Sequence, residues 1–207
     1  LTRDKPNEPG KNVNNAAVVA VDPQSGEIRV MLGSPDYFTA KIDGAVNAAI
    51  AHRQPGSSIK PITYAAAFDP TAPDPMSPAT MILDVRSSFP TKEGDPYVPK
   101  NYDQQFHGPV SARTALASSY NIPAVKVLQH VGLPRMIDLA RKIGITTFGQ
   151  PDRYGFALTL GGGEVRLIDM TMAYSVFANG GHKIDPVAVT EISNAKGEVI
   201  YRDTPQS

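Results

Sequence analysis

Residues 17–33 read AVVAVDPQSGEIRVMLG, and this stretch predicts a β-hairpin. Residues 17–22 are a short apolar run, and residues 23–26 have the proline and glycine of a turn. In residues 27–33 every second position from Ile28 to Leu32 carries a branched aliphatic side chain, which is the period of a strand with one buried face. We therefore expect the fold to begin with two antiparallel strands.

A second hairpin is predicted near residue 200, where strand-like runs at 187–192 and 198–201 flank a turn with Gly197. Helical patterns occupy much of the chain between the two hairpins, at residues 57–68, 111–118, 123–130, 134–142 and 165–178. The predicted order along the chain is strands, then mainly helices, then strands again. This order favours an α/β protein of the α+β arrangement. We predict an antiparallel sheet flanked by helices rather than alternating βαβ units.

Two other segments have a biased composition. Residues 1–14 are polar and rich in Pro, Gly, Lys and Asn, so we interpret them as a linker or disordered entry segment before a domain at 15–207. Residues 69–109 are dense in proline, and we expect them to cross a surface rather than form core elements.

The overall composition excludes several classes of protein. With 207 residues, a formal net charge of zero and 41% hydrophobic residues, the chain can form one ordinary soluble domain with a core. No run of Lys and Arg supplies a basic stripe, so no nucleic-acid partner is expected. There is no cysteine, which removes disulfides and thiolate chemistry. The four histidines lack ligand spacing, and we expect neither metal nor cofactor. No apolar run approaches the ~20 residues of a membrane helix, so any anchor is expected outside this sequence.

Residues 55–61, PGSSIKP, place Ser57 at a predicted helix start and Lys60 one turn later. Residues three apart lie on one face of a helix, so the serine hydroxyl could approach the lysine amine. Serine needs a base to become a nucleophile, and lysine is a base only when burial lowers its pKa from ~10.4. The N–H groups of the first turn could form half of an oxyanion hole. This pattern predicts a nucleophile, Ser57, and its base, Lys60.

A purely structural alternative exists, in which Ser57 caps a helix and Lys60 is solvated. A Ser-x-x-Lys match arises by chance on the order of once in a chain of this size. Ser193 and Lys196 also fit the pattern, but Gly197 follows them between two strand-like runs, so we interpret that copy as a hairpin turn. The motif at Ser57 therefore needs independent support.

That support is the triplet Ser119-Tyr120-Asn121, which lies where one predicted helix gives way to the next. A serine and an asparagine in a tight turn can offer a hydroxyl relay and an amide that holds a substrate carbonyl or N–H. Serine and asparagine are also favoured in turns simply because they bond nearby backbone groups. The two motifs together are more specific than either alone.

Around these motifs the sequence resembles the transpeptidase domain of penicillin-binding proteins, most closely the bifunctional class A type. The resemblance is carried by RQPGSSIKP (53–61), ALASSYNIPA (115–124) and LGGGE (160–164), with further agreement at SPAT (77–80), NY (101–102) and AYSVFANGG (173–181). It extends from about residue 15 to the last residue, so it is not a single short match.

The resemblance implies a D,D-transpeptidase that acts on the D-Ala-D-Ala end of a peptidoglycan stem peptide. Ser57 would attack the penultimate D-Ala carbonyl with Lys60 as base, Ser119 would relay a proton to the leaving amine, and Asn121 would hold the acyl group and orient Lys60. A second stem peptide would resolve the acyl-enzyme, and β-lactams would be trapped at Ser57. The family works at the outer face of the cytoplasmic membrane, and a class A member carries a glycosyltransferase domain upstream.

One departure from the family is the absence of its third motif, Lys-Thr/Ser-Gly, which supplies a cation and the second oxyanion N–H. In the family this motif follows the region that resembles residues 173–201. We therefore expect this chain to be the N-terminal part of the domain, inactive by itself, with the missing C-terminal part on another chain, cleaved or lying beyond it. An open sheet edge and uncovered apolar faces would follow.

Two other functions stay open: a D,D-carboxypeptidase that favours water over an amine, and a non-catalytic penicillin-recognising sensor. A β-lactamase is disfavoured, because the Glu-x-x-Leu-Asn pattern that Glu164 begins has Ile168 in place of asparagine. We expect Glu164 to be an acidic residue at a helix N-terminus. Residues 161–163, three glycines, are interpreted as a close-packed turn rather than a phosphate cradle.

Overall fold

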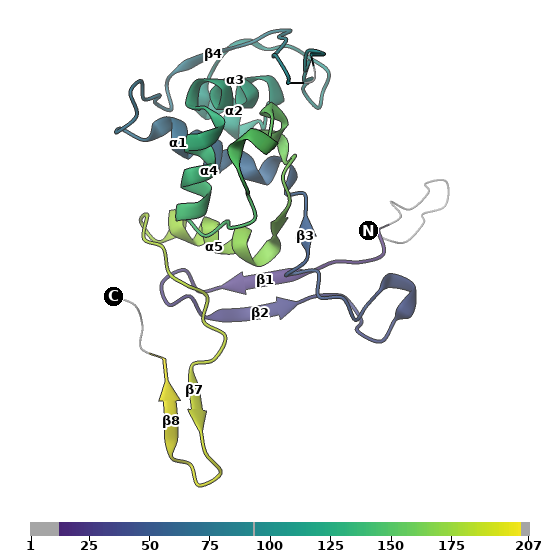
Figure 1. Cartoon of the computed structure of the whole chain (residues 1–207), viewed down its shortest axis with the longest axis vertical. Helices are drawn as coiled ribbons and strands as arrows, with labels where there is room; N and C mark the ends of the chain where they lie inside the picture. Colours follow the sequence, from purple (N-terminus) through teal and green to yellow (C-terminus); the bar gives the residue numbers. More distant parts are fainter. Residues whose placement is uncertain (1–12, 93, 204–207) are drawn as a thin grey trace. The chain divides into compact units, whose positions relative to one another are not determined.

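The computed structural model, drawn in Figure 1, describes residues 13–92 and 94–203. The chain divides into two compact units. Unit 1 comprises Leu1–Arg53 and Arg166–Ser207, and unit 2 comprises Gln54–Val165. The short strands β3 (His52–Arg53) and β6 (Val165–Arg166) lie where the chain passes from one unit to the other. Most of the predicted entry segment, residues 1–14, lies outside the described residues.

Unit 2 is mainly helical and contains one hairpin. Its elements are η2 (Gly56–Ile59), α1 (Lys60–Phe68), β4 (Met81–Asp84), β5 (Gly108–Ser111), α2 (Ala112–Ala117), α3 (Asn121–Val131), α4 (Leu133–Lys142), η3 (Pro151–Arg153) and η4 (Phe156–Leu160). The helices α1 to α4 form one group of coiled ribbons in Figure 1 and contact one another. Helix α1 packs against α3 and α4, and buried side chains of α1, α2, α3 and β4 form a common hydrophobic cluster.

The apolar spacing of α1 determines which side it buries. The spacing of Ile59, Ile62, Ala66 and Ala67 predicts that these residues form the interior side of the helix, and all four are buried. Pro61 occupies the first turn of the helix, where its missing N–H has no intrahelical partner to lose. The predicted buried face is confirmed.

The expectation that residues 69–109 form no core elements is wrong. Strands β4 and β5 pair antiparallel from Met81 with Ser111 to Asp84 with Gly108, and Ile82 and Asp84 are buried. The reason is local. Strand β4 lies in a proline-free run between Pro78 and Pro90. Strand β5 tolerates Pro109 because the pair has only two strands, which leaves every strand an edge.

Unit 1 contains the first predicted hairpin, β1 (Val18–Val21) paired antiparallel with β2 (Ile28–Leu32), together with η1 (Ala40–Ile42) and α5 (Leu167–Ala178). Helix α5 packs against β1. The turn of the hairpin needs glycine, because Gly26 has φ +76° and an added Cβ would lie 2.2 Å from the carbonyl oxygen of Asp185.

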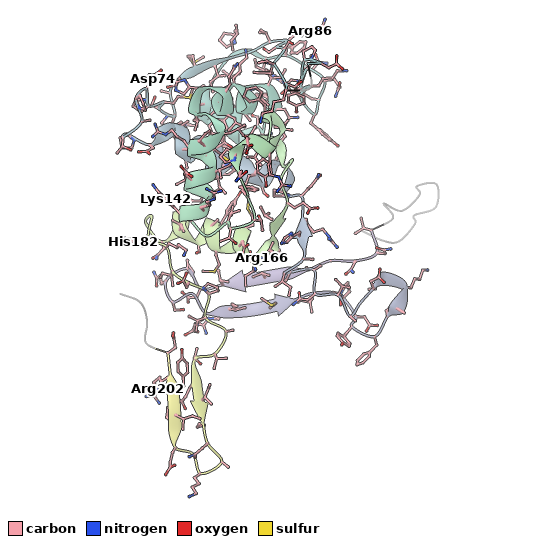
Figure 2. All side chains as sticks on the ribbon, viewed as in Figure 1. Asp74, Arg86, Lys142, Arg166, His182 and Arg202 are labelled. Atoms are coloured by element: carbon pink, nitrogen blue, oxygen red, sulfur yellow. The ribbon has the colours of Figure 1, made fainter. Side chains whose placement is uncertain are left out.

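The second predicted hairpin is β7 (Glu191–Ser193) with β8 (Val199–Arg202). Arg202, which is labelled on β8 in Figure 2, pairs with Glu191 across the two strands. The nitrogen–oxygen distance is 2.6 Å. Gly197 has φ +83° in the connection, so the second Ser-x-x-Lys match is a hairpin turn, as predicted.

The fold class is confirmed as a mixture of helices and antiparallel strands, although the strands form separate two-stranded pairs. Large apolar side chains are exposed on both hairpins of unit 1, including Val18, Leu32 and Ile200. Among residues 13–92 and 94–203, none of the helices has the length and apolar character needed to cross a bilayer.

Candidate active site

Ser57 lies in the single 3₁₀ turn η2, and the α-helix begins only at Lys60. The predicted helix at 57–68 therefore starts with a tighter turn. Residues three apart eclipse one another in a 3₁₀ helix, so the side chains of Ser57 and Lys60 still project from the same face of the turn. Gly56 enters the turn with φ +58°, a conformation that side chains rarely adopt. Ser57 itself is exposed.

Lys60 is 1% exposed, and its ammonium group is surrounded by acceptors. Nζ donates to the carbonyl oxygen of Ser119 at 2.6 Å, to Ser119 Oγ at 3.1 Å and to Asn121 Oδ1 at 2.7 Å. These three acceptors match the three donors of an ammonium group. Burial lowers the pKa of Lys60 to about 8, which makes the neutral amine accessible near physiological pH.

The four predicted site residues are thus placed by four different elements of unit 2, with Ser57 in η2 and the other three at the ends of helices. Lys60 opens α1, Asn121 opens α3, and Ser119 follows the end of α2. The structure brings Lys60, Ser119 and Asn121 into hydrogen-bond contact. The Ser57 hydroxyl is not one of the three acceptors of Lys60, so the predicted approach of this pair is not realised as one of these bonds.

Ser119 has φ +55° and ends helix α2 in a Schellman arrangement. Its N–H donates to the carbonyl of Leu116 at 3.0 Å, and the Tyr120 N–H donates to the carbonyl of Ala115 at 3.0 Å. Glycine is the usual residue at such a position, and a residue with a Cβ costs about 1 kcal/mol there. Strain of this kind is typical of functional sites. Here the residue that carries the strain also gives Lys60 both its carbonyl and its hydroxyl oxygen.

The glycine run at 161–163 packs against the turn that carries Ser57. Gly161 has φ +95°, and an added Cβ would lie 2.3 Å from the backbone nitrogen of Gly56. Nearby, the hydroxyls of Thr63 and Thr159 lie 2.8 Å apart and are fully buried, which joins α1 to η4. The interpretation of these glycines as a close-packed turn is confirmed.

Sequence reasoning missed a polar cluster next to the Ser119–Asn121 turn, formed by the buried Asp84 and Asn101 and the partly buried His107. Asn101 was noted only for its agreement with the family, and His107 only as lacking ligand spacing. A usable signal was present in Asp84, a charged residue at the buried position of an alternating strand pattern. Within the described part of the chain, no group of three or more His, Asp or Glu side chains is arranged to hold a metal ion.

Comparison with known proteins agrees with this geometry. The family model described as the penicillin binding protein transpeptidase domain matches residues 16–207. Penicillin-binding protein 1A of Aquifex aeolicus is 32% identical over 194 residues, which cover 92% of this chain and 25% of the relative. Penicillin-binding protein 1A of Pseudomonas aeruginosa is 34% identical over 191 residues, which cover 92% of this chain and 22% of the relative.

Solved structures give the same result. The crystal structure of penicillin-binding protein 1A from Haemophilus influenzae superposes with a TM-score of 0.81 at 28% identity, covering 96% of this chain and 28% of that one. The PonA1 protein of Mycobacterium tuberculosis in complex with penicillin V has a TM-score of 0.75 at 22% identity, covering 91% of this chain and 50% of that one. Because its identity to this chain is only 22%, the similarity to PonA1 concerns the fold alone.

The fold and the match over residues 16–207 define a transpeptidase domain of the penicillin-binding type. The chain belongs to the penicillin-binding protein transpeptidase family. It spans about a quarter of the length of the curated relatives it matches, at 25% and 22% of the two named above.

Proposed function

We propose that this chain supplies the nucleophile and the base of a serine D,D-transpeptidase that cross-links peptidoglycan stem peptides. The observation that carries the proposal is the buried Lys60 amine, whose hydrogen bonds go to the serine and the asparagine of the Ser119–Asn121 motif. A lysine that served only to cap or solubilise a helix would extend into water. This lysine lies inside the unit, one turn after an exposed serine.

In the proposed acylation step, neutral Lys60 accepts the proton of the Ser57 hydroxyl while Ser57 Oγ attacks the carbonyl carbon of the penultimate D-Ala. A tetrahedral intermediate forms, and the N–H of Ser57 provides one donor to its oxyanion. The C–N bond to the terminal D-Ala then breaks. Ser119, whose Oγ lies 3.1 Å from Lys60 Nζ, relays the proton from Lys60 to the departing amine.

Asn121 has two roles in this proposal. Its Oδ1 accepts from Lys60, which fixes the amine, and its amide group holds the acyl chain of the substrate. In the second step the amine of another stem peptide attacks the Ser57 ester, Lys60 accepts a proton of that amine, and Ser57 Oγ leaves with a proton. A new amide bond has then replaced the one that was broken. β-Lactams would acylate Ser57 in the same way.

The remaining parts of the site are proposed to come from residues outside this sequence. They would provide the Lys-Thr/Ser-Gly strand, with its cation for the substrate carboxylate and its second oxyanion N–H. The exposed apolar residues of the unit 1 hairpins, among them Val18, Leu32 and Ile200, support a covering segment there. By the family resemblance, the reaction takes place at the outer face of the cytoplasmic membrane, and the chain alone is inactive.

Product analysis tests the proposal against its alternatives. The natural protein containing this sequence is incubated with a D-Ala-D-Ala stem peptide, with and without an acceptor amine, and the products are separated by mass. A transpeptidase releases D-Ala and forms the amide with the acceptor. If release of D-Ala is accompanied only by the free acid even at high acceptor concentration, the protein is a D,D-carboxypeptidase. If neither product forms although penicillin binds covalently, it is a sensor.

A further inference from the structure

Helix α3, which begins with Asn121, has no capping side chain of its own. Its N-cap residue, Tyr120, makes no side-chain hydrogen bond to the helix. The free N–H groups of the first turn are instead bound by Asn101, whose Oδ1 accepts from the N–H of Asn121 at 2.8 Å and from the N–H of Ile122 at 3.3 Å. An asparagine some 20 residues upstream therefore does the work of a helix cap.

Asn101 is held in one orientation by its remaining partners. It is 2% exposed, and its Nδ2 donates to Asp84 Oδ1 at 3.0 Å, to Asp84 Oδ2 at 2.8 Å and to the carbonyl of Gln105 at 2.8 Å. Rotating the amide by 180° would turn its NH₂ toward the N–H groups of α3 and its oxygen toward a carboxyl group. Asp84, which is fully buried at the end of β4, thus decides which end of Asn101 faces the helix.

Asp84 also binds the residue that packs on Tyr120. Its Oδ2 accepts from the backbone N–H of His107 at 3.1 Å and lies 2.6 Å from His107 Nδ1. The other ring nitrogen of His107 lies 3.1 Å from Asp103 Oδ2, and the ring stacks on Tyr120 with centroids 3.9 Å apart. The hydrogen bond between the His107 ring and the Asp84 carboxyl group is the main cause that raises the pKa of His107.

These contacts converge on the residue that orients Lys60. The backbone of Asn121 is bound by Asn101, and its side-chain Nδ2 donates to the carbonyl of Lys100 at 2.8 Å. Its Oδ1 is left for Lys60 Nζ. Asn101 itself forms hydrogen bonds with Asp84, with Gln105 and with the first N–H groups of α3. It is connected to Lys60 through Asn121.

We propose that Asn101, oriented by Asp84, is a positioning residue for acyl transfer, acting by fixing Asn121 and the preceding Ser119 carbonyl against Lys60. The proposal rests on the function proposed above. It also explains why Asp84 and Asn101 are buried, although burial of polar groups costs free energy of folding. Reactive groups lose rate steeply when their geometry relaxes, and a misplacement of about 1 Å can cost on the order of a hundredfold.

The test measures the acylation rate constant and the dissociation constant for a chromogenic β-lactam in the natural protein containing this sequence. Asn101→Ala is expected to lower the rate constant by about tenfold to a hundredfold at a temperature where circular dichroism shows it folded. The control is Ile137→Ala, a fully buried residue of α4 whose apolar side chain takes no part in the hydrogen bonds of Asn101, Asn121 and Lys60. It is expected to lower Tm without changing the rate constant. Equal rates for Asn101→Ala and the wild type would overturn the proposal.

A charge swap separates positioning from general destabilisation. Asn101→Asp alone would place the new carboxyl group against that of Asp84, with no donor between them. Asp84→Asn alone would place two amide groups opposite each other, so the orientation of Asn101 would no longer be fixed by a carboxyl group. The double variant Asp84→Asn/Asn101→Asp restores a donor opposite an acceptor and keeps an oxygen at the start of α3. It is expected to acylate at least tenfold faster than Asn101→Asp. No recovery in a folded double variant would count against the Asp84–Asn101 bond as the orienting contact.

The proposed function can fail separately. If the wild type is folded and not acylated, the nucleophile assignment is wrong, and the positioning claim is then decided by NMR titration of the Lys60 amine. The Asn101→Ala variant is expected to shift the pKa of Lys60 from its value of about 8, and Ile137→Ala is expected to leave it unchanged. An unshifted Lys60 pKa in Asn101→Ala would overturn the proposal.

Discussion

The Nζ atom of Lys60 lies 2.7 Å from Oδ1 of Asn121, although 61 residues separate them in the chain. Each is the first residue of a helix, α1 for Lys60 and α3 for Asn121, and these two helices pack against each other. A side chain at a helix start is not enclosed by a preceding turn of its own helix, so it can turn toward a neighbour. The site is therefore assembled from the ends of these elements.

The positive φ of Ser119 predicts a trade-off between stability and activity. Ser119→Gly removes the Cβ at φ +55° and should raise the free energy of unfolding by about 0.5 to 1 kcal/mol. It also removes the Oγ that lies 3.1 Å from Lys60 Nζ, so acylation should fall by about a hundredfold. Urea unfolding and β-lactam acylation measure the two effects.

Ser119→Ala is the matched control, because it also lacks the hydroxyl but keeps the Cβ. We expect the same loss of acylation without the gain in stability. A glycine variant that is less stable than the alanine variant would contradict the strained conformation of Ser119.

The lowered pKa of Lys60 predicts how acylation depends on pH. The folded protein favours the neutral amine relative to the unfolded chain, whose lysine has its ordinary pKa of 10.5. The rate should therefore rise as pH increases through about 8, with a gain of about tenfold between pH 7 and pH 9. Stopped-flow acylation over this range measures the midpoint.

Lys60→Arg tests the same prediction from the other side, because arginine keeps the charge and is not deprotonated. We expect it to lose acylation by about a hundredfold to ten-thousandfold at every pH. A wild-type rate that stays flat from pH 7 to 9 would argue against Lys60 as the base.

Most of the helices and strands could be predicted from the sequence, because the residue patterns that indicate them are local. The alternation from Ile28 to Leu32 predicts β2, and the spacing of Ile59, Ile62 and Ala66 predicts the buried face of α1. Strands β4 and β5 were missed because the prolines around them dominate the local signal. Proline excludes a strand interior, but it does not exclude a short edge pair beside it.

The candidate site was predictable only as a list of residues. The two motifs identify Ser57, Lys60, Ser119 and Asn121 by type and spacing, but no spacing rule predicts that Lys60 bonds to Ser119 and Asn121. That contact follows from the packing of α1 on α3. The cap that Asn101 provides for α3 was missed for the same reason, because it is a tertiary contact and not a local one.

The close approach of Gly161 to Gly56 predicts a severe effect of a small change. Gly161→Ala would place a Cβ 2.3 Å from the nitrogen of Gly56 and would hold a side chain at φ +95°. The cost should be about 2 to 5 kcal/mol of stability, with a displaced Ser57 turn. Gly149→Ala is the control, because an added Cβ there meets nothing within 4 Å. Thermal unfolding of the two variants with similar Tm would contradict this packing.

The buried hydroxyl of Tyr64 predicts a substitution that is tolerated. Tyr64 is 1% exposed, and its hydroxyl has no hydrogen-bond partner among the residues that the structure describes. Burial of this group also raises its pKa. Tyr64→Phe removes the unpaired group and keeps the ring, so the free energy of unfolding should stay equal or rise by about 1 kcal/mol. Tyr64→Ala, which removes the ring as well, should cost about 3 to 5 kcal/mol. A large loss in Tyr64→Phe would reveal a partner for the hydroxyl.

The assignment of Ser57 as the nucleophile is tested most directly by mass spectrometry of the natural protein containing this sequence after reaction with benzylpenicillin. We predict one covalent penicilloyl group, located by peptide mapping on Ser57. It should be absent from Ser57→Ala and retained in Ser58→Ala, whose native hydroxyl already donates to the carbonyl of Pro55 at 2.7 Å. An unmodified folded wild type, or a penicilloyl group that persists in Ser57→Ala, would contradict the account.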